Sequence, residues 1–276
     1  MSSDTLVELC FFDSKVAVET RSPELAGVVR TLWAPFLAGD ADRSTSGIGT
    51  PTTVVEIPDA DQPLTDQLSW LNANLNSTAM ELSPCLCIHA GVVACDEGVV
   101  AFPGRSGAGK STLTSACLQQ GFDYVSDEGL CLDYDQASVR PYPRPIGLSP
   151  WSAAAMGERR AGGGVEAGED WLLSAADLGS RATLPGTPQL RVVHVVLLDR
   201  RADIAAALHE AERREAIEAL LTMSFNHYKR PADSLALVAT VVAEARVSRL
   251  TYSDPHEAAA LLAAEVSDPT ARRRNP

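Results

Sequence analysis

The sequence predicts an α/β fold, and three features of the chain indicate it. Runs rich in β-branched residues, at 85–95 and 97–102, alternate with segments whose apolar residues recur at helical spacing. A glycine-rich loop joins the second of these runs to a helix-like segment. Residues 191–199 form an almost unbroken apolar run, which is typical of a strand buried on both faces of a sheet.

The length and composition suit one large domain, or a compact domain with a smaller one attached. The chain has 276 residues, of which 45% are hydrophobic and 21% charged, so it can bury a sizeable core. Its character changes at Pro84, where the β-branched runs begin. We therefore expect an N-terminal α+β portion at 1–84, a main domain at 85–266 and a disordered tail at 267–276.

The N-terminal portion alternates between strand-like and helix-like patterns. Pro23 suits the first turn of a helix, and the polar stretch rich in glycine and threonine suits a loop. The predicted elements are, in order, paired strands at 6–12 and 15–20, a helix at 23–37, a loop at 38–52, a strand at 53–57 and an amphipathic helix at 67–80.

The main domain begins with a predicted hairpin and ends in a predicted helical region. The two runs at 85–95 and 97–102 are separated by a short acidic turn, which indicates adjacent strands. The later predicted elements are a helix at 111–120, an acidic strand-like segment at 123–135, a proline-rich extended segment at 138–151, a glycine-rich mobile loop at 157–170, the buried strand at 191–199, and helices at 205–221, 235–243 and 255–265.

Charge and cysteine usage exclude some classes of partner. The net charge of −13 and the pI near 4.8 argue against general binding to nucleic acids or anionic membranes, because phosphate groups repel such a surface. The start of the sequence does not read as a signal peptide, and no stretch approaches the roughly 20 apolar residues of a membrane helix. The six cysteines form no CxxC pair, so we expect free thiols in a reducing cytoplasm.

A phosphate-binding loop is the strongest motif in the chain. Residues 104–111 read GRSGAGKS and fit G-x-x-x-x-G-K-[ST], between a predicted strand and a predicted helix. The glycines let backbone N–H groups curl around a phosphate, the lysine reaches the β and γ phosphates, and the serine hydroxyl is placed for Mg²⁺. The residues expected to contact the nucleotide are Gly104, Arg105, Ser106, Gly107, Ala108, Gly109, Lys110, Ser111 and Thr112.

Two acidic residues follow at the end of the next predicted strand, where they can share a crevice with the loop. Asp127 comes 17 residues after Lys110, and Glu128 follows it directly. One carboxylate of such a pair can hold Mg²⁺ while the other accepts a proton from an attacking hydroxyl. His89 lies 21 residues before Lys110 on an apolar strand, where a histidine is by itself more often a core residue than a catalytic one.

The chain lacks the extra signatures of two large classes of phosphate-loop protein. It has no LSGGQ-like sequence of the transporter ATPases and no NKxD-like guanine reader of the GTPases. The order HAGVV, PGRSGAGKSTL and YVSDE instead resembles the HPr kinase/phosphorylase catalytic domain, whose nucleotide fold is similar to that of phosphoenolpyruvate carboxykinase. The resemblance covers residues 86–133. In detail it is similar to stand-alone relatives found beside ribosomal-peptide biosynthetic genes, some of which phosphorylate a serine of a precursor peptide.

The resemblance implies a P-loop core of the HPr kinase/PEP carboxykinase type and a role for each site residue. Asp127 would serve as the base for the acceptor hydroxyl, His89 would sit near the γ phosphate, and Glu128 would help to hold Mg²⁺ with Ser111. The family carries aspartate where this chain has Glu128. The segment that supports the reverse, phosphorylase reaction is missing, so we expect neither that reaction nor HPr as substrate. Relatives are often oligomeric, so the resemblance makes self-association plausible, and the sequence leaves the oligomeric state open.

These features together predict an ATP- and Mg²⁺-dependent kinase acting on a hydroxyl, with a seryl or threonyl group of a peptide or protein favoured. Two alternatives stay open: a kinase of a free small molecule, and a nucleotide-binding regulatory module without transfer activity. An arginine can stabilise the charge of the transition state. Arg105, Arg140 and Arg144 are candidates for this role, although each is by default a solvated surface charge.

Overall fold

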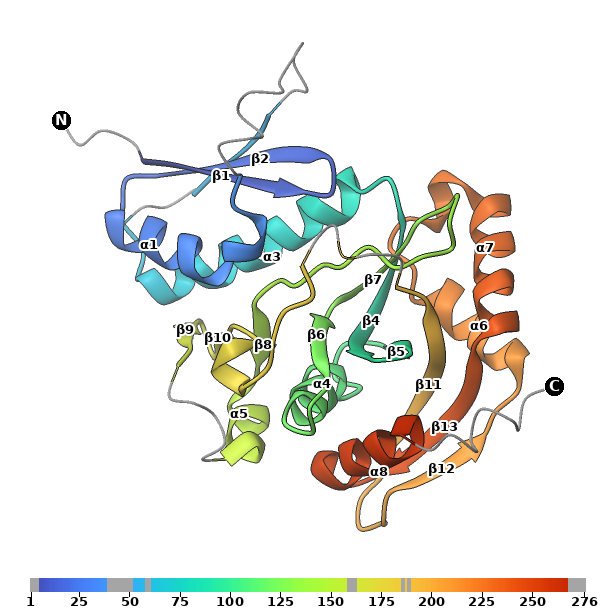
Figure 1. Cartoon of the computed structure of the whole chain (residues 1–276). Helices are drawn as coiled ribbons and strands as arrows, with labels where there is room; N and C mark the ends of the chain where they lie inside the picture. Colours follow the sequence, from blue (N-terminus) through green and yellow to red (C-terminus); the bar gives the residue numbers. More distant parts are fainter. Residues whose placement is uncertain are drawn as a thin grey trace.

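The computed structural model shows a mixed α/β protein whose strands form three sheets (Figure 1). It describes residues 5–38, 52–57, 61–157, 163–184, 187 and 190–267. Among the helices in these ranges, none combines the length and the apolar character that crossing a bilayer requires.

The N-terminal portion forms a three-stranded sheet with helices packed on it. Strands β1 and β2 make an antiparallel hairpin, and β3 lies parallel to β2. The elements are β1 (Thr5–Phe11), β2 (Ser14–Thr20), α1 (Pro23–Leu32), the 3₁₀ turn η1 (Ala34–Phe36), β3 (Thr53–Glu56) and α3 (Leu64–Leu82). Helix α1 starts as its sequence predicts, because the Ser22 hydroxyl accepts the Leu25 N–H and Pro23 occupies the first turn.

The hydrophobic core beneath this sheet reaches across the expected boundary at residue 84. It joins Trp33 and Leu68 of the N-terminal portion to Tyr142 and Leu172 of the later chain. The N–H of Gly168 also donates to the carbonyl of Thr65 at the start of α3, over 2.9 Å. Helix α3 therefore contacts segments before and after residue 84. The domain limits themselves stay a prediction.

The central sheet has seven strands in the order β12-β13-β11-β5-β4-β6, with β7 also paired to β4. Its strands are β4 (Leu86–Cys95), β5 (Gly98–Pro103), β6 (Asp123–Ser126), β7 (Gly129–Leu132), β11 (Val192–Arg200), β12 (Ala207–Glu210) and β13 (Arg246–Tyr252). The expected hairpin is confirmed as β4–β5. Strand β6 follows β5 in the sequence but does not lie next to it in the sheet, because β4 lies between them and runs antiparallel to both. Strands β5 and β6 therefore still end at the same edge of the sheet.

Helices cover both faces of the central sheet. Helices α6 (Arg213–Thr222) and α7 (Pro231–Glu244) pack against one face of β4 and β5. Helices α4 (Lys110–Leu118) and α8 (Pro255–Ser267) pack against the other face. The expected tail at 267–276 lies outside the described residues except for Ser267, the last residue of α8.

The predicted helical C-terminal region is wrong in two places. The helix expected at 205–221 begins only at Arg213, and strand β12 occupies Ala207–Glu210. The strand β13 was not predicted at all, yet it pairs with β11 on one side and β12 on the other. Both segments gain their strand structure from pairing with neighbouring strands of the sheet, which local propensity does not report.

A second three-stranded sheet, in the order β8-β10-β9, stands beside the central one. The remaining elements are β8 (Ile146–Leu148), α5 (Pro150–Met156), β9 (Val165–Ala167), β10 (Asp170–Leu173) and the 3₁₀ turns η3 (Ala176–Leu178) and η4 (His227–Lys229). Part of the glycine-rich segment predicted to be a mobile loop is thus regular structure, since β9 pairs with β10. Residues 158–162 of that segment lie outside the described residues.

Candidate active site

The glycine-rich loop leaves β5 and runs into the N-terminal end of α4, as the sequence predicts. Gly109 caps this helix at a φ of 94°, in the left-handed region that favours glycine. A Cβ atom there would lie 2.7 Å from the hydroxyl oxygen of Tyr252, so a larger residue would also meet β13. The free amides and the dipole of a helix N-terminus favour an anion at this point.

Lys110 is buried against this loop. Its ammonium donates to the carbonyl of Arg105 across the loop over 3.1 Å, and the residue is only 5% exposed. Burial lowers the pKa of Lys110, while the carboxylates of Glu128 and Asp127 act in the opposite direction. An anion bound in the loop would stabilise the charged form of this lysine further.

Strand β4 carries the residues that join the loop to the acidic pair. The N–H of Gly104 donates to the carbonyl of His89, and the N–H of Ala90 donates to the carbonyl of Glu128, each over 3.3 Å. Gly91, two residues after His89, lies where a Cβ atom would come within 2.5 Å of the Thr114 hydroxyl of α4. The sequence His-Ala-Gly thus places an imidazole and a close helix contact on one face of the strand.

The acidic pair occupies a break between β6 and β7. The hydroxyl of Ser126 accepts the N–H groups of Glu128 (3.2 Å) and Gly129 (2.9 Å), and this turn interrupts the pairing with β4 between β6 and β7. The β4–β6 register shifts at this point, between Val92 and Val93. The serine of YVSDE is therefore a local reason for the position of both carboxylates.

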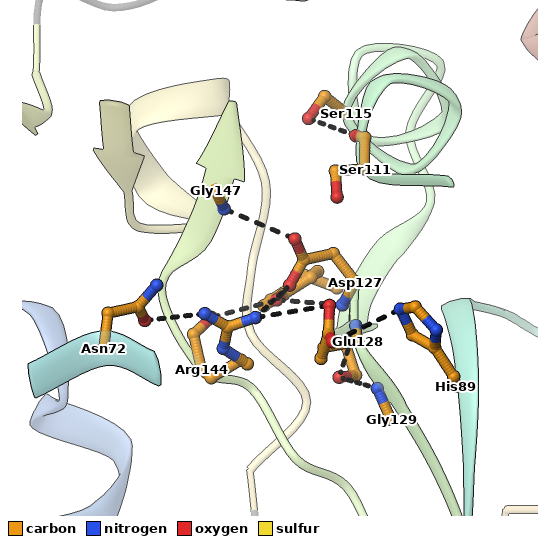
Figure 2. A network of polar contacts seen from close by, with 11 residues as sticks. Asn72, His89, Ser111, Ser115, Asp127, Glu128, Gly129, Arg144 and Gly147 are labelled. Carbon is orange, nitrogen blue, oxygen red and sulfur yellow. Dashed lines mark hydrogen bonds and ion pairs between the residues drawn. The ribbon is translucent and has the colours of Figure 1, made fainter. Parts of the chain in front are cut away.

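Asp127 is the more buried of the two acids, with 1% of its surface exposed. It accepts hydrogen bonds from the Tyr124 hydroxyl at 3.0 Å and from the Gly147 N–H at 3.3 Å (Figure 2). Burial raises the pKa of Asp127 above its usual value, although the Arg144 charge and hydrogen bonds from Ser111 and Tyr124 oppose this.

Glu128 has the opposite electrostatic balance. Burial alone would raise its pKa, but the hydrogen bond from His89 and the charges of Arg144 and Lys110 together bring the pKa below its usual value. The His89 Nε2 lies 3.2 Å from Glu128 Oε1, and the Glu128 side chain is 25% exposed. Two neighbouring carboxylates thus differ in pKa direction because they have different partners.

Of the three arginines considered, Arg144 lies at the acidic pair. Its Nη1 is 3.7 Å from Asp127 Oδ1 and 3.6 Å from Glu128 Oε2, and its side chain is 7% exposed. The default of a solvated surface charge is wrong for this residue. Arg140 instead pairs with Asp13 at 3.0 Å, and Arg105 is exposed beside a separate cavity of about 370 Å³.

A cavity of about 660 Å³ opens over the loop, and it brings most of the expected site residues together. His89 and Glu128 line it, and so do Ser106, Gly107, Gly109, Lys110, Ser111 and Thr112. Gly104 and Arg105 line the smaller cavity instead, and Ala108 lines a third, behind the loop. Asp127 is not among the described residues that line the 660 Å³ cavity, and it is buried.

Sequence reasoning missed several residues of the cavity and its polar network, among them Arg200, Trp151 and Asn72. Arg200 ends β11, lines the cavity and lies with its guanidinium carbon 4.3 Å from the ring centre of Trp151, which lines the cavity too. The rule that sites form beyond the carboxyl ends of parallel strands would have pointed to Arg200. Asn72 of α3 accepts from Arg144, and no sequence signal connects these two residues.

The oxygen donors at the cavity suit Mg²⁺ bound with a nucleotide. The described residues hold no cluster of three or more histidine, cysteine, aspartate or glutamate side chains that would bind a metal by themselves. Ser111 and Glu128 both line the cavity, and Ser111 acts to lower the pKa of Asp127. A hydroxyl and one or two carboxylates, completed by phosphate oxygens and water, are an ordinary magnesium environment.

Comparison with known proteins gives a weak likeness to solved structures. No family model matches the chain, and no curated protein matches it. Among solved structures it is similar to the Hpr(Ser) kinase/phosphatase from Coxiella burnetii, at 12% sequence identity over 68% of this chain and 97% of that one. The TM-score of 0.35 is too low to carry a conclusion about fold or activity.

Proposed function

We propose that the chain is an ATP- and Mg²⁺-dependent kinase that transfers the γ-phosphoryl group to a hydroxyl, with a serine or threonine of a peptide or protein as the favoured acceptor. The observation that carries this proposal is one cavity lined by Lys110 and Ser111 of the phosphate-binding loop, by Glu128 of the β6–β7 junction and by His89 of β4. Its volume of about 660 Å³ is ordinary for a nucleotide-sized ligand.

In the proposed reaction the acceptor oxygen bonds to the γ phosphorus as the bond from that phosphorus to the β-bridging oxygen breaks, which releases ADP. The enzyme contributes chiefly position and charge. Lys110 and the start of α4 bind the β and γ phosphates, and Arg200 at the cavity rim adds a second positive charge. Mg²⁺, held by Ser111 and Glu128, would neutralise further charge on the phosphates.

We assign the two carboxylates different roles. The raised pKa of Asp127 suits a base that takes the proton of the acceptor hydroxyl, whereas the lowered pKa of Glu128 suits a ligand that stays ionised. His89, bound to Glu128, fixes that side chain at the cavity wall. The alternative assignment, with Glu128 as the base and Asp127 as the magnesium ligand, is favoured by the greater exposure of Glu128. Substitution of each acid in turn distinguishes the two assignments.

A neutral or basic acceptor is favoured. The chain carries a net charge of −13, and the acidic residues Asp170 and Glu128 line the cavity together with the basic Lys110 and Arg200. With phosphates bound to the basic side chains, the remaining acidic side chains would repel an anionic acceptor.

Mass spectrometry of phosphate transfer tests the proposal. The purified protein with Mg-ATP would be given the peptides encoded beside its gene and, in parallel, free serine, threonine and small alcohols. One added phosphate on a peptide hydroxyl supports the proposal. Transfer only to a small molecule would make the chain a small-molecule kinase, and tight nucleotide binding without any transfer would make it a regulatory module.

A further inference from the structure

We propose that Asn72 is a positioning residue of this kinase: from helix α3 it holds the guanidinium of Arg144 between Asp127 and Glu128, so that the N-terminal portion completes the active site. The inference rests on the proposed function. It gives a catalytic purpose to a part of the chain that contains neither the phosphate-binding loop nor the acidic pair.

Arg144 lies at nearly the same distance from the two carboxylates. Its Nη2 donates to Asn72 Oδ1 over 2.6 Å, a short hydrogen bond to a neutral acceptor. Its Nη1 stands 3.7 Å from Asp127 and 3.6 Å from Glu128, just beyond hydrogen-bonding distance of either carboxylate. Figure 2 shows the guanidinium between the amide and the two acids. Arg144 therefore shares its charge between both carboxylates without being locked to one of them.

The backbone of Arg144 belongs to the same network. Its carbonyl lies 2.9 Å from the Tyr124 hydroxyl, which also lies 3.0 Å from Asp127. The side chain of Arg144 is 7% exposed, so water does not readily replace a lost partner. If the Asn72 oxygen were removed, the nearest remaining acceptors for the guanidinium would be the carboxylates themselves. A direct ion pair between Arg144 and Asp127 would hinder Asp127 as the base, and a direct ion pair with Glu128 would hinder Glu128 as the magnesium ligand.

Helix α3 is placed firmly enough to act as a support. Leu68, Leu71 and Leu75 on this helix are fully buried in the core that also holds Tyr142, two residues before Arg144. Asn72 follows Leu71 directly, so its position is set by this packing. Positioning of a charged group by an outer residue typically affects activity through geometry, since catalytic groups tolerate little displacement.

The first test replaces Asn72 by leucine, which keeps the size of the side chain and removes its acceptor. We expect Asn72→Leu to lower kcat about 10- to 100-fold, as loss of an outer hydrogen-bonding partner does. Because the phosphate-binding loop is untouched, the Kd for Mg-ATP should stay within about threefold of that of the unaltered protein. Asn74→Leu is the matched control, because Asn74 lies on the same helix and donates to the Trp70 carbonyl of that helix, so it should leave kcat unchanged.

A double-variant cycle separates positioning from a general loss of structure. If Asn72 acts through Arg144, Asn72→Leu should lower kcat little further in an Arg144→Lys background. Effects that multiply, or a lowered melting temperature with unchanged kcat, would overturn the inference and leave the kinase proposal standing. An unaltered protein that transfers no phosphate to any acceptor would overturn both.

Discussion

The phosphate-binding loop and the junction between β6 and β7 face each other across one cavity, yet they are built in different ways. The loop is a single stretch of sequence, residues 104–111, between one strand and one helix. The junction holds two adjacent acids. Besides the nearby Tyr124, their partners come from other segments of the chain: His89, Lys110, Arg144 and Gly147. Asn72 in turn binds Arg144.

The difference teaches which properties are local. Glycine backbone freedom and the helix N-terminus give the loop its anion-binding character wherever it is placed. The character of the acids depends on their neighbours, since Asp127 and Glu128 are adjacent residues with pKa values shifted in opposite directions. Loss of a loop residue should therefore affect binding, and loss of a junction residue should affect transfer.

Substitution of each acid by its amide should give the largest effect. If ATP binding were lost together with transfer, the contrast between a binding loop and a catalytic junction would be wrong. Asp127→Asn should lower the rate of transfer about 10²- to 10⁴-fold, as for loss of a general base, with ATP binding retained. Glu128→Gln should raise the Mg²⁺ concentration needed for half-maximal activity. Initial rates against Mg²⁺ concentration and isothermal titration with ATP measure both. A larger loss for Glu128→Gln at saturating Mg²⁺ would exchange the assigned roles.

Substitution of the loop lysine should change ATP binding, the property that we assign to the loop. Lys110→Met should weaken ATP binding by about 1.5–3 kcal/mol, or roughly 10- to 150-fold, because a charged hydrogen bond to phosphate is lost. Lys229→Met is the control, since Lys229 pairs with Glu81 through a contact of 2.8 Å that lies outside the cavity. Equal affinity of the Lys110 variant and the unaltered protein, in titration calorimetry, would contradict phosphate binding in the loop.

Arg200 provides a finer test, because it ends a strand of the central sheet and reaches the same cavity as the loop. Arg200→Ala should reduce kcat about tenfold or more through loss of a charge contact to phosphate. The neighbouring Arg201 is a matched control, since it pairs with Asp199 at 2.6 Å and does not line the 660 Å³ cavity. A similar loss of kcat in Arg201→Ala would indicate that the effect comes from surface charge rather than from a contact in the cavity.

The pH dependence of transfer sharpens the contrast between the two acids. A base must be ionised, so kcat/KM should fall as pH falls through the pKa of Asp127, which burial places above its usual 3.8. The Tyr124 hydrogen bond lowers that pKa, so Tyr124→Phe should move the acid limb of the profile to higher pH. If Glu128 were the base, the limb would lie below the usual 4.5 of a glutamate.

The smallest expected effect concerns stability, and it tests whether the conformation of the loop depends on its contact with β13. Gly109→Ala should cost about 1–2 kcal/mol, because alanine is strained at a φ of 94°. Its Cβ would also meet the Tyr252 hydroxyl, which has no hydrogen-bond partner in the described part of the chain. Tyr252→Phe should therefore recover part of that loss in urea unfolding. Recovery of nothing would mean that only backbone strain limits this position.

Much of the central fold could be read from the sequence because its signals are local. The β4–β5 hairpin, the loop and helix α4 follow from β-branched runs, turn residues and glycines, and the structure confirms them. Strands β12 and β13 could not be read in this way. Their residues form strands because β11 offers β13 an edge to pair with, and β13 in turn offers one to β12.

The candidate site divides along the same line. The sequence by itself determined which chemical groups are present: the loop with Lys110, the acids and a histidine at a fixed spacing, each recognisable because its meaning lies in neighbouring residues. Only the tertiary structure decided that Glu128 lines the cavity while Asp127 lies behind it, and that Asn72 reaches Arg144. Burial and charge act through space, so contacts between distant segments set what each carboxylate can do.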